Sequence, residues 1–195
     1  MSSPPIKSSA EPAAVESTCS EHGLSVAEFK ELQGRCVGAK ATAYCPYSKF
    51  RVGASVLSVD NVYFNGANVE NASYPVGTCA ERVALGKAVT EGHRKIKAVA
   101  VATDISPPAT PCGMCRQFIR EFCDLKSPII MFDKDENYVA MRLEELSATC
   151  GLSLEPSDFC KILQRCEARR VESEEASGPQ QEMERLSNDN SWKRL

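Results

Sequence analysis

Three cysteines and one glutamate have the types and spacing of a catalytic metal site. Cys112 and Cys115 are three residues apart, so one helical turn can direct both sulfurs at a single ion. Cys79 and Glu81 lie two residues apart in an earlier segment. Thiolates from Cys79, Cys112 and Cys115 would fill three corners of a zinc tetrahedron. The fourth corner is left for water, which distinguishes a catalytic zinc site from a closed structural one.

Glu81 can act as a proton carrier in such a site, because it lies close enough to face the bound water without being a ligand. Zinc lowers the pKa of its bound water toward neutrality, so hydroxide forms at physiological pH. A neighbouring carboxylate can take the released proton and pass it to a leaving group. The residues therefore indicate a hydrolytic enzyme with one Zn²⁺ per subunit.

Both cysteine segments begin an expected helix, and the positive end of a helix dipole favours the thiolate that a metal needs. A nearly continuous apolar strand lies between them and would bring the two helix starts together. Hydrophobic periodicity and turn residues predict the remaining elements. The expected helices are 25–43, 80–91, 112–122 and 155–166, and the expected strands are 51–59, 62–68, 96–103, 128–132 and 138–141. This alternation predicts an α/β domain with a mixed sheet.

Composition divides the chain into three parts. Residues 1–20 are rich in Ser, Pro, Ala and Glu and have no apolar period, so we expect a disordered tail. Residues 21–166 form the expected domain, which begins near a capping-box pattern at Ser25 and Glu28. Residues 167–195 carry mixed charges and few core residues, and we expect a second disordered tail there.

The overall charge and the cysteine content narrow the class of partners. The formal net charge is −3, which argues against a nucleic-acid partner. The sequence has neither an apolar run long enough to span a membrane nor a secretory signal, so we expect no membrane partner. Ten cysteines then suggest thiols in a reducing compartment, that is, a cytoplasmic protein with nuclear access open.

The motifs resemble those of the cytidine deaminases of nucleoside salvage, in the small homotetrameric form with three cysteine ligands. The segments that carry the resemblance read Thr-Cys-Ala-Glu-Arg (78–82) and Pro-Cys-Gly-Met-Cys-Arg-Gln (111–117). Further agreement lies in Tyr-Cys-Pro-Tyr-Ser-Lys-Phe (44–50) and Gly-Ala-Asn-Val-Glu-Asn-Ala-Ser-Tyr (66–74). The resemblance implies a three-layer α/β/α fold with a mixed five-stranded sheet, and a homotetramer as the self-associated form.

The resemblance also implies roles for individual residues. Phe50 would pack against the pyrimidine ring, while Asn68 and Glu70 would bind the ribose 3′-hydroxyl. The Ala80 backbone would read the base edge together with Glu81. The remaining two roles belong to Arg82, which would donate hydrogen bonds to the cysteine ligands, and to Tyr74, which would reach a neighbouring subunit's site.

The implied reaction converts cytidine and deoxycytidine into uridine and deoxyuridine. Zinc-bound hydroxide attacks C4 of the base, and Glu81 moves protons to N3 and to the departing ammonia. The alternatives are a nucleic-acid-editing cytidine deaminase, a deaminase of a cytosine-containing antibiotic, and a zinc-binding module without catalysis. A closed four-cysteine site would require Cys123, which lies about two helical turns beyond Cys115.

One position departs from the resemblance. Leu154 stands where the family has a Phe that helps to cap a neighbour's base pocket. We expect weaker substrate binding from this change, on the order of 1 kcal/mol of lost aromatic stacking, with the chemistry retained.

Overall fold

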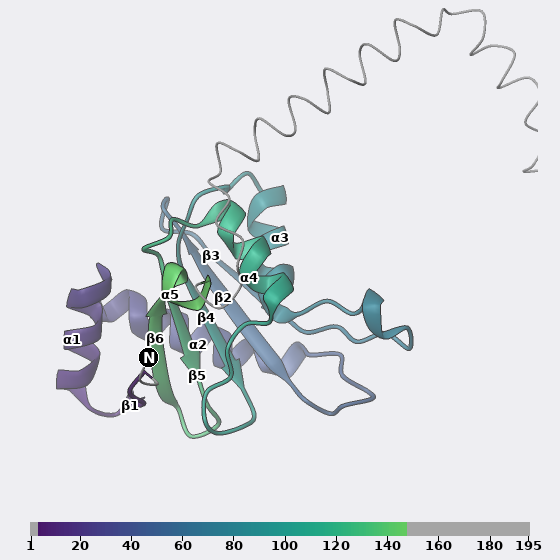
Figure 1. Cartoon of the computed structure of the whole chain (residues 1–195), viewed down its shortest axis with the longest axis horizontal. Helices are drawn as coiled ribbons and strands as arrows, with labels where there is room; N and C mark the ends of the chain where they lie inside the picture. The colour runs from purple at the N-terminus through teal and green to yellow at the C-terminus, as the bar shows by residue number, and fades with distance from the viewer. Residues whose placement is uncertain (1–3, 148–195) are drawn as a thin grey trace, which may run out of the picture. The chain divides into compact units, whose positions relative to one another are not determined.

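The computed structural model describes residues 4–147, which form a mixed sheet covered by helices on both faces (Figure 1). The sheet order is β1-β6-β5-β4-β2-β3; β4 and β5 are parallel and all other neighbours are antiparallel. The strands are β1 (Lys7–Ser8), β2 (Val52–Ser58), β3 (Tyr63–Ala67), β4 (Ile96–Thr103), β5 (Pro128–Phe132) and β6 (Asn137–Arg142). The α-helices are α1 (Pro12–His22), α2 (Val26–Ala39), α3 (Ala80–Thr90), α4 (Gly113–Phe122) and α5 (Leu143–Ser147).

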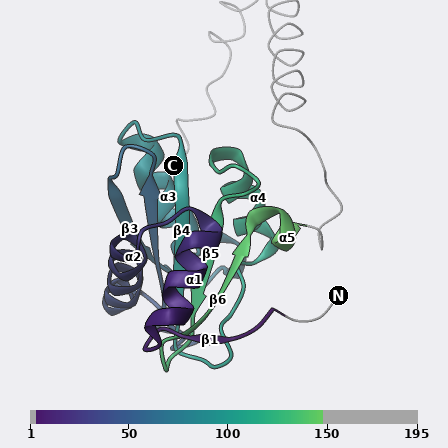
Figure 2. The same cartoon turned by 90° about the vertical axis from the view of Figure 1, so that its left-hand side faces the viewer.

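The apolar residues of β4 explain why it reads as a continuous run, because the strand is buried on both faces. Val99 and Val101 contribute to the hydrophobic core shared with α3 and α4. Ala98, Ala100 and Ala102 point to the opposite core, which is shared with α1 and α2. Figure 2 separates α2 from α4 on opposite sides of the strands. The three-layer α/β/α prediction is therefore confirmed.

The connection from β4 to β5 carries α4 across one face of the sheet. Because β4 and β5 are parallel, the chain must cross over one face of the sheet between them, so the loop after β4 leaves the plane of the sheet before α4 begins. Cys112 is the N-cap residue of α4, so this topology places it beyond the carboxyl end of β4. Ligand sites in open α/β sheets lie at such strand ends.

The start of α2 agrees with the predicted capping box. The Ser25 side chain accepts a hydrogen bond from the Glu28 amide, and the Glu28 carboxylate accepts one from the Ser25 amide. Glu28 also forms an ion pair with Lys97 on β4, at 2.6 Å. The cap therefore also joins α2 to the central sheet.

The prediction of a disordered segment over residues 1–20 is wrong from Lys7 onward. Thr18 and Cys19 of α1 are buried, and Thr18 Oγ1 lies 3.0 Å from the hydroxyl of Tyr138. The helix presents only a narrow buried face that includes polar Thr18, so it has no clear apolar period. Its end signals were nevertheless present, as Pro12 at the first helical position and Gly23 in the left-handed conformation after the last.

All five predicted strands are present, and the count of five was wrong by one. The additional strand is β1, whose two residues pair with Tyr138 and Asn137 at the β6 edge. The short helix α5 was also not predicted. The expected helix 155–166 and the expected tail 167–195 lie outside the described residues, and no helix among those described is long and apolar enough to cross a membrane.

Gly66 provides a test of how α3 is seated on the sheet. A Cβ at Gly66 would lie 2.6 Å from the Ala80 carbonyl oxygen and would also meet the Ala84 backbone. We expect Gly66→Ala to lower the free energy of unfolding by about 2 kcal/mol or more, because neither backbone can yield without moving α3. Urea unfolding followed by circular dichroism measures this change.

The matched control is Gly86→Ala on α3, where an added Cβ meets nothing within 4 Å. This substitution is expected to raise stability by about 0.5–1 kcal/mol through helix propensity alone. Equal stability of the two variants would show that the close approach at Gly66 does not set the position of α3.

Candidate active site

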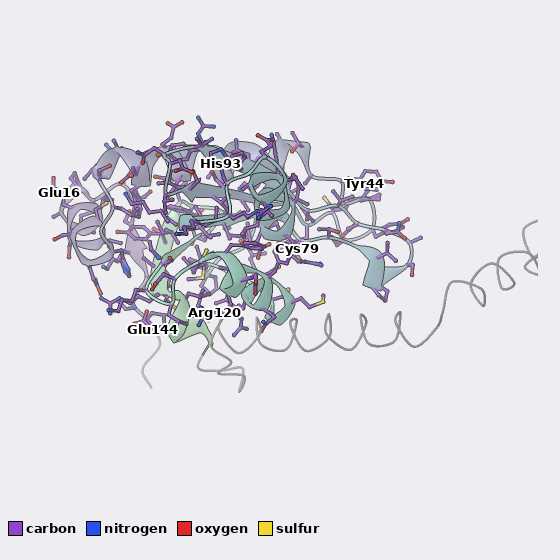
Figure 3. All side chains as sticks on the ribbon, turned by 90° about the horizontal axis from the view of Figure 1, so that it is seen from above. Glu16, Tyr44, Cys79, His93, Arg120 and Glu144 are labelled. Carbon is purple, nitrogen blue, oxygen red and sulfur yellow. The ribbon has the colours of Figure 1, made fainter. Side chains whose placement is uncertain are left out.

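The side chains of Cys79, Cys112 and Cys115 converge between the starts of α3 and α4. Their three Sγ atoms all lie within 4.8 Å of one another, and those of Cys79 and Cys112 are 3.9 Å apart. Tetrahedral zinc thiolates require an S–S separation of about 3.8 Å. Figure 3 shows Cys79 near these helices, with Tyr44 on the loops farther out and Glu16 at the opposite end. The donor set therefore fits a zinc ion.

Two helix N-termini face the thiol cluster. Cys79 and Cys112 are the N-cap residues of α3 and α4, and Cys115 lies in the first turn of α4. A hydrogen bond from Cys115, together with Arg82, lowers the pKa of Cys79 to about 5. The same contact with Cys79, together with burial, raises the pKa of Cys115. The surroundings of Cys79 thus favour its thiolate form.

Arg82 lies behind the thiols on the first turn of α3. Its Nη2 donates to the Gly77 carbonyl at 3.2 Å, and its Nε is buried with no hydrogen-bond acceptor among the described residues. Burial lowers the pKa of the guanidinium, but hydrogen bonding and charge attraction from Cys79 outweigh it and leave the pKa raised. Three thiolates on Zn²⁺ carry a net charge of −1, and a cation at this position offsets that excess.

Glu81 lies at the inner end of the site, with only 4% of its surface exposed. Burial raises the pKa of its carboxyl group, and the charge on Cys79 raises it further. A carboxyl group with a raised pKa takes up and releases protons nearer to neutral pH than an exposed one does. The position of Glu81 beside the thiols therefore suits it to carry protons.

A pocket of about 340 Å³ opens above the thiols and Glu81, which is within the range of small-molecule sites. One wall comes from the loop before β2, through Tyr47 and Phe50, and another from the loop after β4, through Ala109 and Thr110. The remaining lining residues are Val52, Asn68, Val69, Glu70, Asn71, Gly77, Thr78, Cys79, Glu81, Arg82, Val101, Thr103, Cys112 and Met114.

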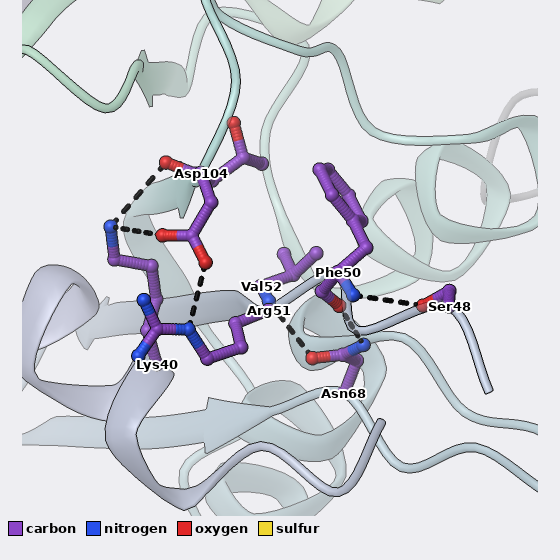
Figure 4. Close-up of polar contacts among 8 residues, drawn as sticks. Lys40, Ser48, Phe50, Arg51, Val52, Asn68 and Asp104 are labelled. Carbon is purple, nitrogen blue, oxygen red and sulfur yellow. Dashed lines mark hydrogen bonds and ion pairs between the residues drawn. The ribbon is translucent and has the colours of Figure 1, made fainter. Parts of the chain in front are cut away.

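Asn68 fixes the backbone on both sides of Arg51 (Figure 4). Its Nδ2 donates to the Phe50 carbonyl at 2.9 Å, and its Oδ1 accepts from the Val52 amide at 2.8 Å. Both ends of the amide are thus engaged at the mouth of the pocket. The sequence predicts a sugar contact for Asn68, and the structure adds this second role in holding Phe50.

Glu70 has a comparable second role. Its carboxylate accepts hydrogen bonds from the Tyr47 amide at 2.9 Å and from the amide and hydroxyl of Ser48. The hydrogen bond from the Ser48 hydroxyl lowers the pKa of Glu70, so the carboxylate is ionised at neutral pH. Glu70 therefore brings a negative charge to the pocket and also closes the loop that carries Phe50.

The structure gives less direct support to the roles predicted for three other residues. Ala80 is fully buried as the first residue of α3 and does not line the pocket. Tyr74 begins the short 3₁₀ helix η2 (Tyr74–Val76), of which only the backbone is described at this residue. Leu154 lies outside the described residues.

The sequence alone did not identify Val101, Ala109 and Thr110 as residues of the pocket walls, because the sequence of a strand end or a loop does not indicate which distant residues it will contact. The position of the loop 104–112 directly after a buried strand was the available signal.

A closed four-cysteine site is not formed by the described residues. Cys123 is the C-cap residue of α4, at the end of the helix opposite to Cys112. It is buried in the core beside the sheet, where its backbone forms a bridge with Ile96. Among residues 4–147, no fourth cysteine or histidine joins the three converging thiols, so a zinc ion held by them would keep its fourth position for water.

Comparison with protein families gives a match over residues 28–131 to the model for the "Cytidine and deoxycytidylate deaminase zinc-binding region". The cytidine deaminase of Sporosarcina psychrophila is 48% identical over 93 residues, which cover 48% of this chain and 68% of that protein. The cytidine deaminase of Halalkalibacterium halodurans is 42% identical over 110 residues, covering 56% of this chain and 83% of that protein.

A solved structure agrees with these matches. The cytidine deaminase from Burkholderia pseudomallei is 35% identical, with a TM-score of 0.58. The similarity covers 60% of this chain and 94% of that one. Almost the whole of that enzyme is thus represented in this fold.

The ligand assignment is tested by Cys112→Ser. Replacing one thiolate by a hydroxyl removes a strong zinc donor, so bound zinc should fall from about one ion per chain to a small fraction after dialysis against a mild chelator. Elemental analysis of the purified protein measures the metal content. Cys45→Ser, at a half-buried thiol outside the cluster, should retain the ion. Full zinc content in Cys112→Ser would remove Cys112 from the ligand set.

Proposed function

We propose that this chain, which belongs to the family of cytidine and deoxycytidylate deaminases, hydrolytically deaminates cytidine and deoxycytidine to uridine and deoxyuridine. The observation that carries the proposal is the convergence of three thiols and buried Glu81 at the base of one pocket. The family is a zinc-binding one, and the donor set fits that ion. This combination activates water beside a ring carbon that can lose ammonia.

Zinc, when bound by the three thiolates, makes water acidic enough to supply the nucleophile at neutral pH. Glu81 would take one proton from the attacking water and deliver it to N3 of the base as the water oxygen bonds to C4. The proton that remains on the new C4 hydroxyl then passes through Glu81 to the amino nitrogen. The C4–N bond breaks, ammonia leaves, and C4 becomes the carbonyl of the uracil ring.

The charges of the pocket favour an unphosphorylated nucleoside over deoxycytidylate. Glu70 is an ionised carboxylate at the mouth, with several hydrogen-bond donors already directed at it. Arg82 is the cation among the described lining residues, and its charge is directed at Cys79 and Cys115. A 5′-phosphate would therefore enter without a free partner for its two negative charges. The same reasoning disfavours a polynucleotide.

The remaining base and sugar contacts of this proposal come from four residues that line the pocket and from the backbone of Ala80, which does not line it. Phe50 packs against the pyrimidine ring, Asn68 and Glu70 bind the sugar, and the Ala80 backbone with Glu81 reads the base edge. The lining positions of Phe50, Asn68 and Glu70 support these roles. Tyr74 completes the site of a neighbouring subunit.

We also propose self-association as a homotetramer. Tyr44, Tyr47, Val69 and Val76 are exposed on the loops around the pocket, and such apolar side chains commonly become buried between subunits. A cytoplasmic location is part of the proposal, because a reducing compartment keeps the three ligand thiols available.

Two other functions fit the molecule less well. A nucleic-acid-editing deaminase needs a basic groove for the strand, whereas this pocket carries two carboxyl groups and the chain has a net charge of −3. A zinc module without catalysis has no use for a buried carboxyl group beside an open metal position. In this chain, Glu81 is such a buried carboxyl group.

Glu81→Gln tests the proton-carrier role. The amide retains the shape of the side chain but cannot exchange protons, so kcat for cytidine should fall by a factor of about 10²–10⁴. Absorbance of the pyrimidine ring follows the reaction in proteins of equal zinc content. Glu91→Gln, at the exposed far end of α3, should keep the wild-type rate. Full activity of Glu81→Gln would refute the role, and an inactive wild-type protein would refute the function.

Substrate charge gives an independent prediction. We expect kcat/KM for deoxycytidylate to be at least about 100-fold lower than for deoxycytidine, because the phosphate enters beside Glu70 without a free cation. Competition between the two substrates in one reaction, resolved by chromatography, measures this ratio. A ratio near one would contradict the assignment to free nucleosides.

A further inference from the structure

The carboxylate of Asp104 connects three segments that are distant in the sequence. Its Oδ1 lies 3.1 Å from Lys40 Nζ, at the end of α2, and its Oδ2 lies 2.8 Å from Arg51 Nε, just before β2 (Figure 4). Lys40 Nζ also donates to the Thr103 carbonyl at 3.4 Å. We call this set of Lys40, Arg51 and Asp104 the Asp104 junction.

The junction lies where the two walls of the pocket leave the sheet. Arg51 directly follows Phe50, the aromatic residue of one wall. Asp104 is the first residue after β4 and begins the loop that carries the opposite wall to Cys112. Val52 and Thr103, the neighbours of these two residues, are paired across β2 and β4. The ion pair between Arg51 and Asp104 therefore spans the base of both walls.

The backbone of Phe50 is hydrogen-bonded on the side of the pocket that faces β3. Asn68 binds the Phe50 carbonyl, and the Ser48 hydroxyl accepts a hydrogen bond from the Phe50 amide at 3.0 Å. Both of these contacts, and those of Glu70, come from the loop itself or from residues beside β3. The Arg51–Asp104 ion pair joins this loop to the first residue after β4, the strand that leads to the candidate metal ligands.

The junction is partly shielded from water, which distinguishes it from an isolated surface pair. The side chains of Lys40, Asp104 and Arg51 are 13%, 28% and 54% exposed. Burial raises the pKa of Asp104, but the hydrogen bonds from Arg51 and Lys40 outweigh it and leave the carboxyl group more acidic than usual. A single exposed ion pair contributes little to the free energy of unfolding. Charge-assisted hydrogen bonds are short and directional, so a carboxylate shared by two cations can fix the relative positions of the segments that carry them.

We propose that Asp104 is a positioning residue for the base-binding wall: through Arg51 it holds Phe50 at the correct distance from the wall that leads to Cys112. The inference rests on the proposed function for its kinetic consequence only. Neither Asp104 nor Arg51 lines the pocket. Their effect must therefore pass through the loop, and it should appear mainly in substrate binding.

Hydrogen–deuterium exchange tests the positioning without reference to catalysis. In zinc-loaded full-length protein, Asp104→Ala and Arg51→Ala should each speed exchange of amides 45–52 by about threefold or more, because the loop loses its tie to β4. Arg35→Ala removes an exposed ion pair within α2, with Glu31, and should leave these amides unchanged. Exchange at wild-type rates in both junction variants would overturn the proposal.

Steady-state kinetics tests the consequence for the reaction. KM for cytidine should rise about three- to fivefold in Asp104→Ala and in Arg51→Ala, with kcat changed less than about twofold and zinc content unchanged. The double variant should be no worse than Asp104→Ala, because both substitutions remove the same Arg51–Asp104 contact. Asp104→Asn, which keeps an acceptor oxygen, should fall between wild type and Asp104→Ala.

The possible failures can be told apart. Independent, multiplying effects of the two substitutions on KM, or an unchanged KM in both, would overturn the inference while leaving the deaminase function intact. A wild-type protein that does not convert cytidine would refute the function, and the exchange experiment would still decide the positioning. If Asp104→Ala fails to fold, Arg51→Ala and Asp104→Asn carry both tests, because each preserves part of the junction.

Discussion

The convergence of two helix N-termini on one cluster of thiols is the constraint on which the site depends. Three thiolates repel one another, and they can be held together only where positive charge is fixed nearby. The starts of α3 and α4 supply part of that charge and Arg82 supplies more. The sheet makes the convergence possible, because Gly66 lets α3 approach β3 closely and the parallel pair β4–β5 requires α4 to begin beyond the strand ends.

The sequence predicted elements and site residues best where a residue pattern has few structural interpretations. The strands β4 and β5 were predicted to the residue because runs of Val, Ile and Ala between turn signals suit only a strand buried on both faces. The candidate zinc ligands could be predicted because a three-residue spacing at a helix start directs two sulfurs to one point whatever the rest of the fold. Burial of Glu81 was not evident from its neighbours in the chain, and it required the packed structure.

The missed features depend on contacts between distant segments. The helix α1 is anchored by Thr18, a buried polar residue whose hydroxyl forms hydrogen bonds with Lys7 Nζ and with the Tyr138 hydroxyl, 120 residues away. Similarly, Asn68 and Glu70 could be recognised as polar residues at a ligand site, but not as the residues that tie down the Phe50 loop. The same groups that would meet a sugar also order the wall beside it, so the proposed sugar binding would be coupled to the order of this loop.

The edge strand β1 and helix α1 have a consequence for where this domain ends. The family match starts at residue 28, yet Val15 and Cys19 of α1 belong to the same core as Phe29 and Phe132. A polypeptide that began at residue 28 would lose α1 and β1, so this core would lose Val15 and Cys19 and the backbone of β6 would lose its partner strand. Unpaired edges of this kind recruit strands from other molecules. The folded domain thus includes residues that precede the family match, and β1 covers the edge of β6 that would otherwise be open to pairing.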